Sequence, residues 1–222
     1  MMIRYQYIYN QVLQIYRQMD VVEFPIEPSD IIARLPNCRL MTYKRFAKLN
    51  DCSVEDVAAL CESSSGCTHY DVANDRYLIL WNDDRSENNV SGRRRWTKAH
   101  ELGHVVLRHL PLMTEPKIAE EDEDFFWDER PTENMNHIST AAFEQEANVF
   151  AATLLCPMPF FEMMEIESPD DIRSVFGLSV AASENRWNEY QKWKRSRVKT
   201  AWESNMRKVL AQKDPLFHMY KS

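Results

Sequence analysis

The sequence predicts a single α+β domain in which a small antiparallel sheet packs on a pair of core helices, with further helices at both ends. Two observations lead to this prediction. Apolar residues recur at helical spacing through residues 93–110 and 140–156, which indicates two long helices that each bury one face. Short segments with aliphatic, aromatic or β-branched side chains at residues 39–43, 68–72 and 76–81 are typical of strands.

The flanking helices follow from the same spacing and from residues that begin or end helices. Ser53, followed three residues later by Asp56, is typical of a helix N-terminus, and Pro111 and Pro157 are expected to end the two long helices. The expected helices span residues 3–19, 29–35, 53–60, 93–110, 140–156, 169–176 and 180–193.

Length and composition are those of a globular domain. The chain has 222 residues, of which 44% are hydrophobic and 27% charged. We therefore expect one domain over residues 1–222. Its core is expected at about residues 76–157, with helices and strands at 1–75 before it and a helical extension at about 169–222 after it.

The composition also excludes several classes of function. The 27 basic and 34 acidic residues give a net charge of -7, so we expect no direct nucleic-acid partner. Four glycines are too few for the glycine-rich phosphate loop of a nucleotide-binding fold. No apolar run reaches membrane-spanning length, so no membrane partner is expected. The chain has five cysteines, an odd number, and its N-terminus is unlike a signal peptide. Both features predict that the protein is located in a reducing cytoplasm.

The chemistry of the chain is indicated by a His-Glu-x-x-His motif inside the predicted helix 93–110. His100 and His104 lie one helical turn apart, so both rings can bind one zinc ion. Glu101 flanks the same face, where a carboxylate can take a proton from water and later return it to a leaving amine. The motif therefore predicts zinc-dependent hydrolysis.

A catalytic zinc site normally has a third protein ligand. Glu144 is our candidate, because a second helix packed on the first can present one carboxylate to the metal. Asn148, one turn further, is expected to bind the outer nitrogen of a ligand histidine. His109 is rejected as a ligand, because in a continuous helix it points away from His100, and Glu146 is expected to face solvent.

Two stretches of the chain resemble the ImmA/IrrE family of bacterial metallopeptidases. Residues 95–109 are similar to that family's R-[FW]-T-x-A-H-E-L-G-H-x-x-L-x-H motif, and residues 144–157 match E-x-x-A-N-x-F-A-A-x-L-L-x-P without a gap. The resemblance is firm over about residues 76–157 and weaker before them and around 176–187.

The resemblance implies a minimal gluzincin-like metallopeptidase with zinc on His100, His104 and Glu144 and with Glu101 as general base. It also implies a substrate, a helix-turn-helix repressor of a phage, a mobile element or a stress regulon. One alternative is a non-catalytic zinc-bearing module that binds a repressor or a toxin–antitoxin partner. Another is a zinc hydrolase acting on a non-protein amide.

Two further features have competing interpretations. Cys52, Cys61 and Cys67 with His69 lack the close spacing of zinc modules, so we expect buried or free thiols. The strand at 76–81 is either an edge on which an extended substrate adds a strand or an ordinary half-buried strand.

The remaining candidates have no assigned role. The acidic segment 115–133 is a solvated loop or a lid that attracts a basic partner, and the first is favoured. The basic segment 186–213 is expected to be helical and to pack its tryptophans on the body of the protein. His137, Tyr190 and Arg186 are candidates for stabilising the oxyanion of the transition state, and the sequence does not choose among them.

Overall fold

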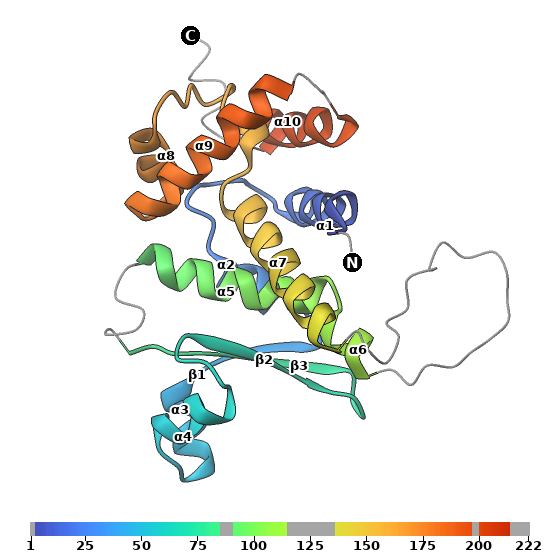
Figure 1. The fold of residues 1–222 in the computed structure, drawn as a ribbon, viewed down its shortest axis with the longest axis vertical. Helices are drawn as coiled ribbons and strands as arrows, with labels where there is room; N and C mark the ends of the chain where they lie inside the picture. Colours follow the sequence, from blue (N-terminus) through green and yellow to red (C-terminus); the bar gives the residue numbers. More distant parts are fainter. Residues whose placement is uncertain (1–2, 85–90, 115–135, 197–199, 214–222) are drawn as a thin grey trace, which may run out of the picture.

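The computed structural model describes residues 3–84, 91–114, 136–196 and 200–213 (Figure 1). Its elements are, in order, α1 (Tyr5–Gln18), α2 (Pro28–Ala33), β1 (Cys38–Thr42), α3 (Tyr43–Asn50), α4 (Val54–Leu60), β2 (Gly66–Asp71), β3 (Arg76–Trp81), α5 (Ser91–Val106), α6 (His109–Thr114), α7 (Asn136–Leu155), a 3₁₀ turn (Met158–Phe160), α8 (Pro169–Phe176), α9 (Val180–Ser196) and α10 (Ala201–Lys213). The α+β class is therefore confirmed. None of the described helices is long and apolar enough to cross a membrane.

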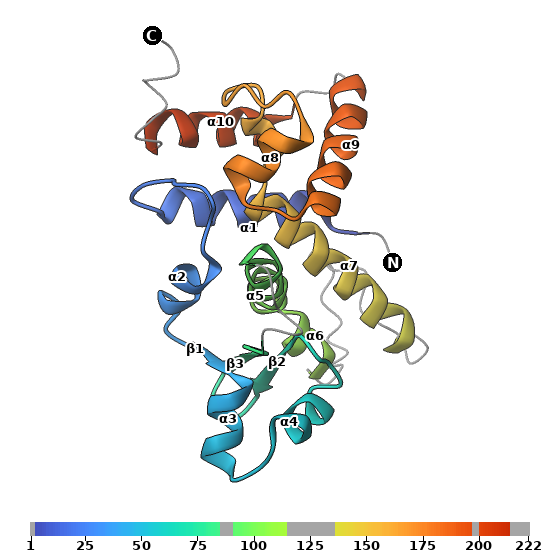
Figure 2. The same cartoon turned by 90° about the vertical axis from the view of Figure 1, so that its left-hand side faces the viewer.

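The elements are stacked in layers along the long axis of the molecule (Figures 1 and 2). The short helices α3 and α4 cover one face of the sheet, where Tyr43, Val57 and Leu80 form a small buried cluster. Helix α5 covers the other face. Helices α7 and α1 follow beyond α5, and α8, α9 and α10 close the far end. The largest core cluster lies between the sheet, α5, α7, α1 and α10.

The sheet has the strand order β1-β3-β2 and is mixed. β2 and β3 pair antiparallel as expected, but β1 runs parallel to β3, so the prediction of a purely antiparallel sheet is wrong. The reason is the connection: the chain leaves β1 through α3 and α4 and forms β2 before it returns as β3. β3 is consequently the central strand and not an edge, and β2 is an edge strand in the described part of the sheet.

The helix expected over residues 93–110 is interrupted. α5 ends at Val106, Arg108 has a φ of 55°, and a separate helix, α6, begins at His109. Pro111 therefore does not end a helix but lies in the first turn of α6, where its missing N–H costs no hydrogen bond. This turn reorients His109 relative to α5.

Helices α5 and α7 cross in close contact at a glycine. A Cβ added at Gly103 would lie 3.1 Å from the Phe150 ring and 3.2 Å from the Ala147 Cα. A Cβ at this position would require these neighbours to give by a few tenths of an ångström, and Phe150 is itself fully buried. This close approach brings the face of α5 that carries the two histidines of the motif next to the part of α7 that carries Glu144.

The C-terminal helices pack their tryptophans as expected. Trp202 is 7% exposed and stacks on Tyr9 with ring centroids 4.5 Å apart. Trp187 and Trp193 both pack on Tyr190, inside a second apolar cluster that includes Phe161. The interleaved aromatic residues of the basic segment therefore hold α9 and α10 on the body of the protein.

Candidate metal centre

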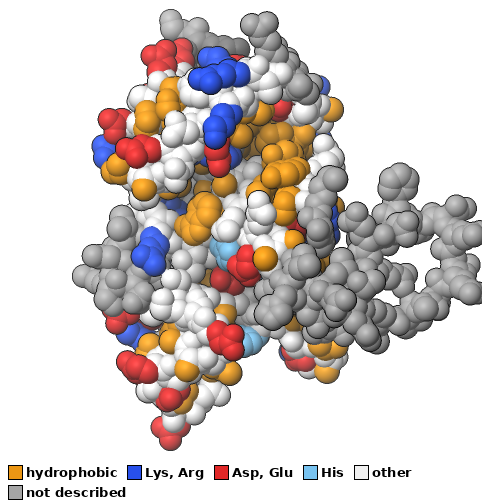
Figure 3. All heavy atoms as spheres, viewed as in Figure 1, with side chains coloured by type: hydrophobic (Ala, Val, Ile, Leu, Met, Phe, Trp, Pro, Cys, Tyr) orange, Lys and Arg blue, Asp and Glu red, His pale blue; other side chains and the backbone are white. Residues whose placement is uncertain are grey.

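The residues expected to bind zinc lie together where α5 crosses α7. His100 and His104 are one turn apart on α5, and Glu144 projects from α7 towards both rings. The histidine side chains are 16% and 12% exposed, whereas Glu144 is 52% exposed. In the space-filling view, histidine and acidic side chains meet near the middle of this face, below an apolar area (Figure 3).

The donor atoms have the spacing of ligands on a single tetrahedral metal. The Nε2 atom of His100 lies 3.1 Å from a Glu144 oxygen, and the Nε2 atom of His104 lies 3.4 Å from the other. The two Nε2 atoms are 3.2 Å apart. Nitrogen and oxygen ligands bound at 2.0–2.1 Å to a tetrahedral zinc lie about 3.3 Å from one another. The donor set therefore fits zinc in both chemistry and separation.

The outer nitrogen of His100 contacts the side chain predicted for it. Its Nδ1 atom lies 3.0 Å from Oδ1 of Asn148, one turn beyond Glu144 on α7. Because the amide oxygen only accepts, this contact places the ring proton on Nδ1 and leaves Nε2 free to bind a metal.

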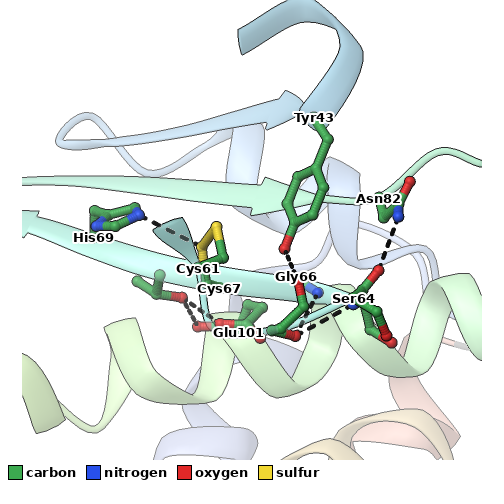
Figure 4. Close-up of a disulfide and its surroundings, with 11 residues drawn as sticks. Tyr43, Cys61, Ser64, Gly66, Cys67, His69, Asn82 and Glu101 are labelled. Carbon is green, nitrogen blue, oxygen red and sulfur yellow. Dashed lines mark hydrogen bonds between the residues drawn. A yellow bond between two sulfur atoms is a disulfide. The ribbon is translucent and has the colours of Figure 1, made fainter. Parts of the chain in front are cut away.

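Glu101 faces the sheet, beside β2. Its carboxylate accepts a hydrogen bond of 2.7 Å from the hydroxyl of Thr68 in β2. A Cβ at Gly66 would lie 2.7 Å from a methyl carbon of Thr97, so the glycine lets β2 approach α5 closely beside Glu101 (Figure 4). Glu101 is 7% exposed, and burial raises its pKa, although the hydrogen bond from Thr68 opposes this effect.

Glu146 and His109 do not lie where they were predicted. Glu146 was expected to face solvent, but its side chain is fully buried and binds Arg4, which precedes α1. His109 is also fully buried, and its Nδ1 atom lies 3.0 Å from Nδ1 of His104. The assumption of a continuous helix was wrong, because the turn at Arg108 brings His109 back beside His104. Pro111 was the available signal, since proline favours the first turn of a helix.

The protonation state of His104 suits metal binding. Burial, together with the neighbouring His100 and His109, lowers the pKa of His104 to about 3, so its ring is neutral. Burial alone would raise the pKa of Glu146, but hydrogen bonds from His109 and Arg4 outweigh it and lower this pKa to about 2. Glu146 is therefore an anion. The neutral ring of His104 is the form in which histidine binds metals.

The cysteine cluster differs from the prediction. Cys61, at the end of α4, forms a disulfide with Cys67 in β2, so these two are not free thiols (Figure 4). His69 lies 3.5 Å from the sulfur of Cys67. As disulfide sulfurs, neither cysteine offers the thiolate that a metal requires. Cys52 has a free thiol, as expected.

The three candidates for stabilising an oxyanion are placed differently. Arg186 is buried, donates to the Cys156 carbonyl at 2.9 Å and lines a cavity of about 320 Å³ between α5, α7 and α9. Tyr190 is 2% exposed and packs among aromatic rings. The side chain of His137 and the acidic segment 115–133 lie outside the described residues.

Comparison with known proteins agrees with this geometry. The model of a peptidase family, M78, described as the IrrE N-terminal-like domain, matches residues 67–188, from β2 into α9. The chain belongs to the ImmA/IrrE family of zinc metallopeptidases. Neither the curated proteins nor the solved structures that were searched contain a match. Membership supports a peptidase role in general, and the metal of this family is typically zinc.

In this ImmA/IrrE protein, the motif residues before His100 attach α5 to its surroundings. Arg95 donates to the Gly177 carbonyl at 2.6 Å and so fixes the turn between α8 and α9. Lys98 binds Glu27 at 3.0 Å and lies over the Trp81 ring, 4.8 Å from its centre. These contacts hold α5 against both the sheet and the C-terminal helices.

Proposed function

We propose that this protein is a zinc-dependent endopeptidase that cuts a protein substrate, with His100, His104 and Glu144 as zinc ligands. The observation that carries the proposal is the separation of their donor atoms, 3.1 to 3.4 Å, which suits one tetrahedral zinc. A purely structural site needs no base beside the metal, so the buried Glu101 favours catalysis.

Glu101 is the general base in this proposal. His100, His104 and Glu144 would hold the zinc, which would supply a Lewis acid that makes water acidic enough to lose a proton near neutral pH. Glu101 takes that proton as the oxygen attacks the peptide carbonyl and returns it to the leaving nitrogen, so that the C–N bond breaks. The raised pKa of Glu101 lies closer to neutral pH, which suits a group that both accepts and donates a proton. Thr68 orients the carboxylate, and Asn148 orients the ring of His100.

The proposed substrate is a helix-turn-helix repressor of a phage, a mobile element or a stress regulon, as the family resemblance implies. The net charge of -7 favours association with a basic DNA-binding protein.

The cavity between α5, α7 and α9 offers space for an apolar side chain. Its wall includes Trp96 and Ala152, each one turn from a residue of the metal centre. We place this reaction in the cytoplasm.

The test combines zinc content with peptide cleavage. Zinc is measured by elemental analysis in the wild type, His104→Ala and Glu144→Ala, and we expect about one zinc per chain in the wild type and a clear loss in both variants. New N-termini are then sought by mass spectrometry after incubation with a proteome-derived peptide library. Glu101→Gln should keep the zinc and cut nothing.

Each outcome selects a function. Full cleavage by Glu101→Gln would refute its role as base. Zinc without cleavage, with a repressor or a toxin–antitoxin partner still bound, would select the non-catalytic module. Cleavage of small non-peptide amides but not of peptides would select the hydrolase of other amides.

A further inference from the structure

A chain of buried and partly buried polar side chains runs from His104 to Arg4, just before α1. Nδ1 of His104 lies 3.0 Å from Nδ1 of His109, and Nε2 of His109 lies 3.1 Å from Oε2 of Glu146. Arg4 then binds both oxygens of Glu146, through its guanidinium at 2.6 to 3.1 Å and through its backbone N–H at 2.9 Å. Four residues from α5, α6, α7 and the segment before α1 thus form one continuous network.

Only one arrangement of protons satisfies every contact when His104 binds a metal. Its Nε2 atom faces Glu144 and His100 and must be unprotonated to bind, so the proton is on Nδ1 and is donated to His109. His109 then accepts at Nδ1 and carries its own proton on Nε2, which it donates to Glu146. Glu146 accepts this bond and those from Arg4 as an anion.

The network is costly for a region that only needs to be packed. Glu146 and His109 are both 0% exposed, and Arg4 is 24% exposed. A buried ion pair is often no more stabilising than apolar side chains of the same volume. His109 already stacks on Phe143, with centroids 4.5 Å apart, so apolar packing was available here. A polar network at this place therefore indicates a role beyond stability.

The two ligand histidines are held in different ways. The outer nitrogen of His100 meets the amide of Asn148, which is exposed to solvent. The outer nitrogen of His104 meets a buried ring that is itself fixed by a buried carboxylate. The latter arrangement restricts both the tautomer and the rotation of the ring, which lowers the cost of ordering this ligand when a metal binds.

We propose that His109, Glu146 and Arg4 are positioning residues that hold His104 in the tautomer that binds metal through Nε2 and thereby raise the zinc affinity of the site. This inference rests on the proposed function, because it takes His104 as a ligand. It makes Arg4, 100 residues before His104, a part of the metal centre. The turn at Arg108 is what allows His109 to take this place.

Zinc affinity tests the proposal without any substrate. The full-length protein is titrated with zinc against a chelating dye in the wild type, His109→Phe, Glu146→Gln and Arg4→Ala. Because loss of a group that orients a ligand typically weakens metal binding by about 10- to 100-fold, we expect a loss in that range for His109→Phe and Glu146→Gln and a smaller one for Arg4→Ala. Glu162→Gln is the matched control, since it removes another arginine–glutamate pair, with Arg207, and should leave the affinity unchanged.

A second measurement separates positioning from folding. Two-bond ¹⁵N–¹H spectra of the zinc-free protein report the tautomer of His104. The wild type should show the Nδ1–H form, and His109→Phe should show a mixture, because the buried Nδ1–H has lost its acceptor. His109→Phe keeps a ring against Phe143, and Arg4→Ala changes a partly exposed residue, so both should retain the wild-type circular dichroism spectrum.

The outcomes distinguish this inference from the proposed function. Zinc binding that is lost in His104→Ala but has wild-type affinity in folded His109→Phe and Arg4→Ala would overturn the inference and leave the proposed function intact. An unchanged tautomer in His109→Phe would also overturn it. A wild-type protein that binds no zinc would overturn both.

Discussion

The hydrogen bond from Thr68 to Glu101 allows a quantitative test of how the proposed base is tuned. The hydroxyl of Thr68 donates to the carboxylate at 2.7 Å, and Glu101 is 7% exposed. Burial raises the pKa of Glu101, and the Thr68 bond lowers it again in part. Thr68→Val keeps the shape of the side chain and removes the donor, so we expect the pKa of Glu101 to rise further.

The size of this rise follows from the energy of the bond. A hydrogen bond to a charged group contributes about 1.5 to 3 kcal/mol, and the protonated carboxyl retains part of it. If about 1.4 kcal/mol of this energy is specific to the ionised form, Thr68→Val destabilises the ionised carboxylate by that amount relative to the protonated carboxyl, which is why the pKa rises.

The ionisation of Glu101 should make the folded protein less stable as the pH rises. Because the pKa of Glu101 is higher in the folded than in the unfolded protein, its ionisation opposes folding. The penalty is absent below the unfolded pKa, grows as the pH rises from the unfolded to the folded pKa, and is constant above the folded pKa. Thr68→Val should therefore lose about 1.4 kcal/mol more of its free energy of unfolding at about pH 8 than at about pH 4.

Two assays measure these effects. The carboxyl carbons of ¹³C-labelled glutamate are titrated by NMR in zinc-free protein, with Glu101→Gln to assign the signal. Urea denaturation at both pH values gives the stabilities. Thr153→Val, which changes a buried threonine of α7, is the control and should leave the pKa of Glu101 unchanged. An unchanged or lower pKa in Thr68→Val, or an equal loss of stability at both pH values, would refute the reasoning.

Three further predictions concern the packing of the metal centre and its occupancy. Gly103→Val should lower the free energy of unfolding by about 1 to 3 kcal/mol in urea and weaken zinc binding, because its side chain meets Phe150 and the backbone of Ala147; equal stability would contradict the close packing. Phe150→Ala, at a fully buried position, should cost about 3 to 5 kcal/mol in the same assay, and a cost below 1 kcal/mol would show that the site is loosely packed. Chelation of zinc should lower the melting temperature measured by scanning fluorimetry, because a metal that binds only the folded state adds about 2.7 kcal/mol when its free concentration is 100 times the Kd. His104→Ala should show no such shift, and an equal shift would mean that the metal binds elsewhere.

The features predicted correctly from the sequence are local. Ser53 and Asp56 form the expected capping box at the start of α4, and α8 has the predicted bounds, Pro169–Phe176. His100 and His104 face the same way because they are four residues apart in one helix. Signals of this kind depend on neighbours within a single element, so one sequence is sufficient to read them.

The errors concern contacts between elements. The parallel pairing of β1 depends on the path of the intervening chain, which strand composition does not specify. The helical period correctly placed Glu146 on a different face of α7 from Glu144, but it does not say what packs there. That face is covered by the segment containing Arg4 and by His109 after the turn at Arg108.

The sequence by itself determined most of the long helices, the family motifs and the residue types of the candidate metal ligands, because periodicity and residue type are properties of short segments. Only the tertiary structure decided that β3 is central, that Cys61 meets Cys67, and that the network behind His104 ends at Arg4. Arg4 and Glu146 are 142 positions apart and meet because α1 packs against α7. Such a contact depends on how whole elements bury their apolar faces together, which no local pattern specifies.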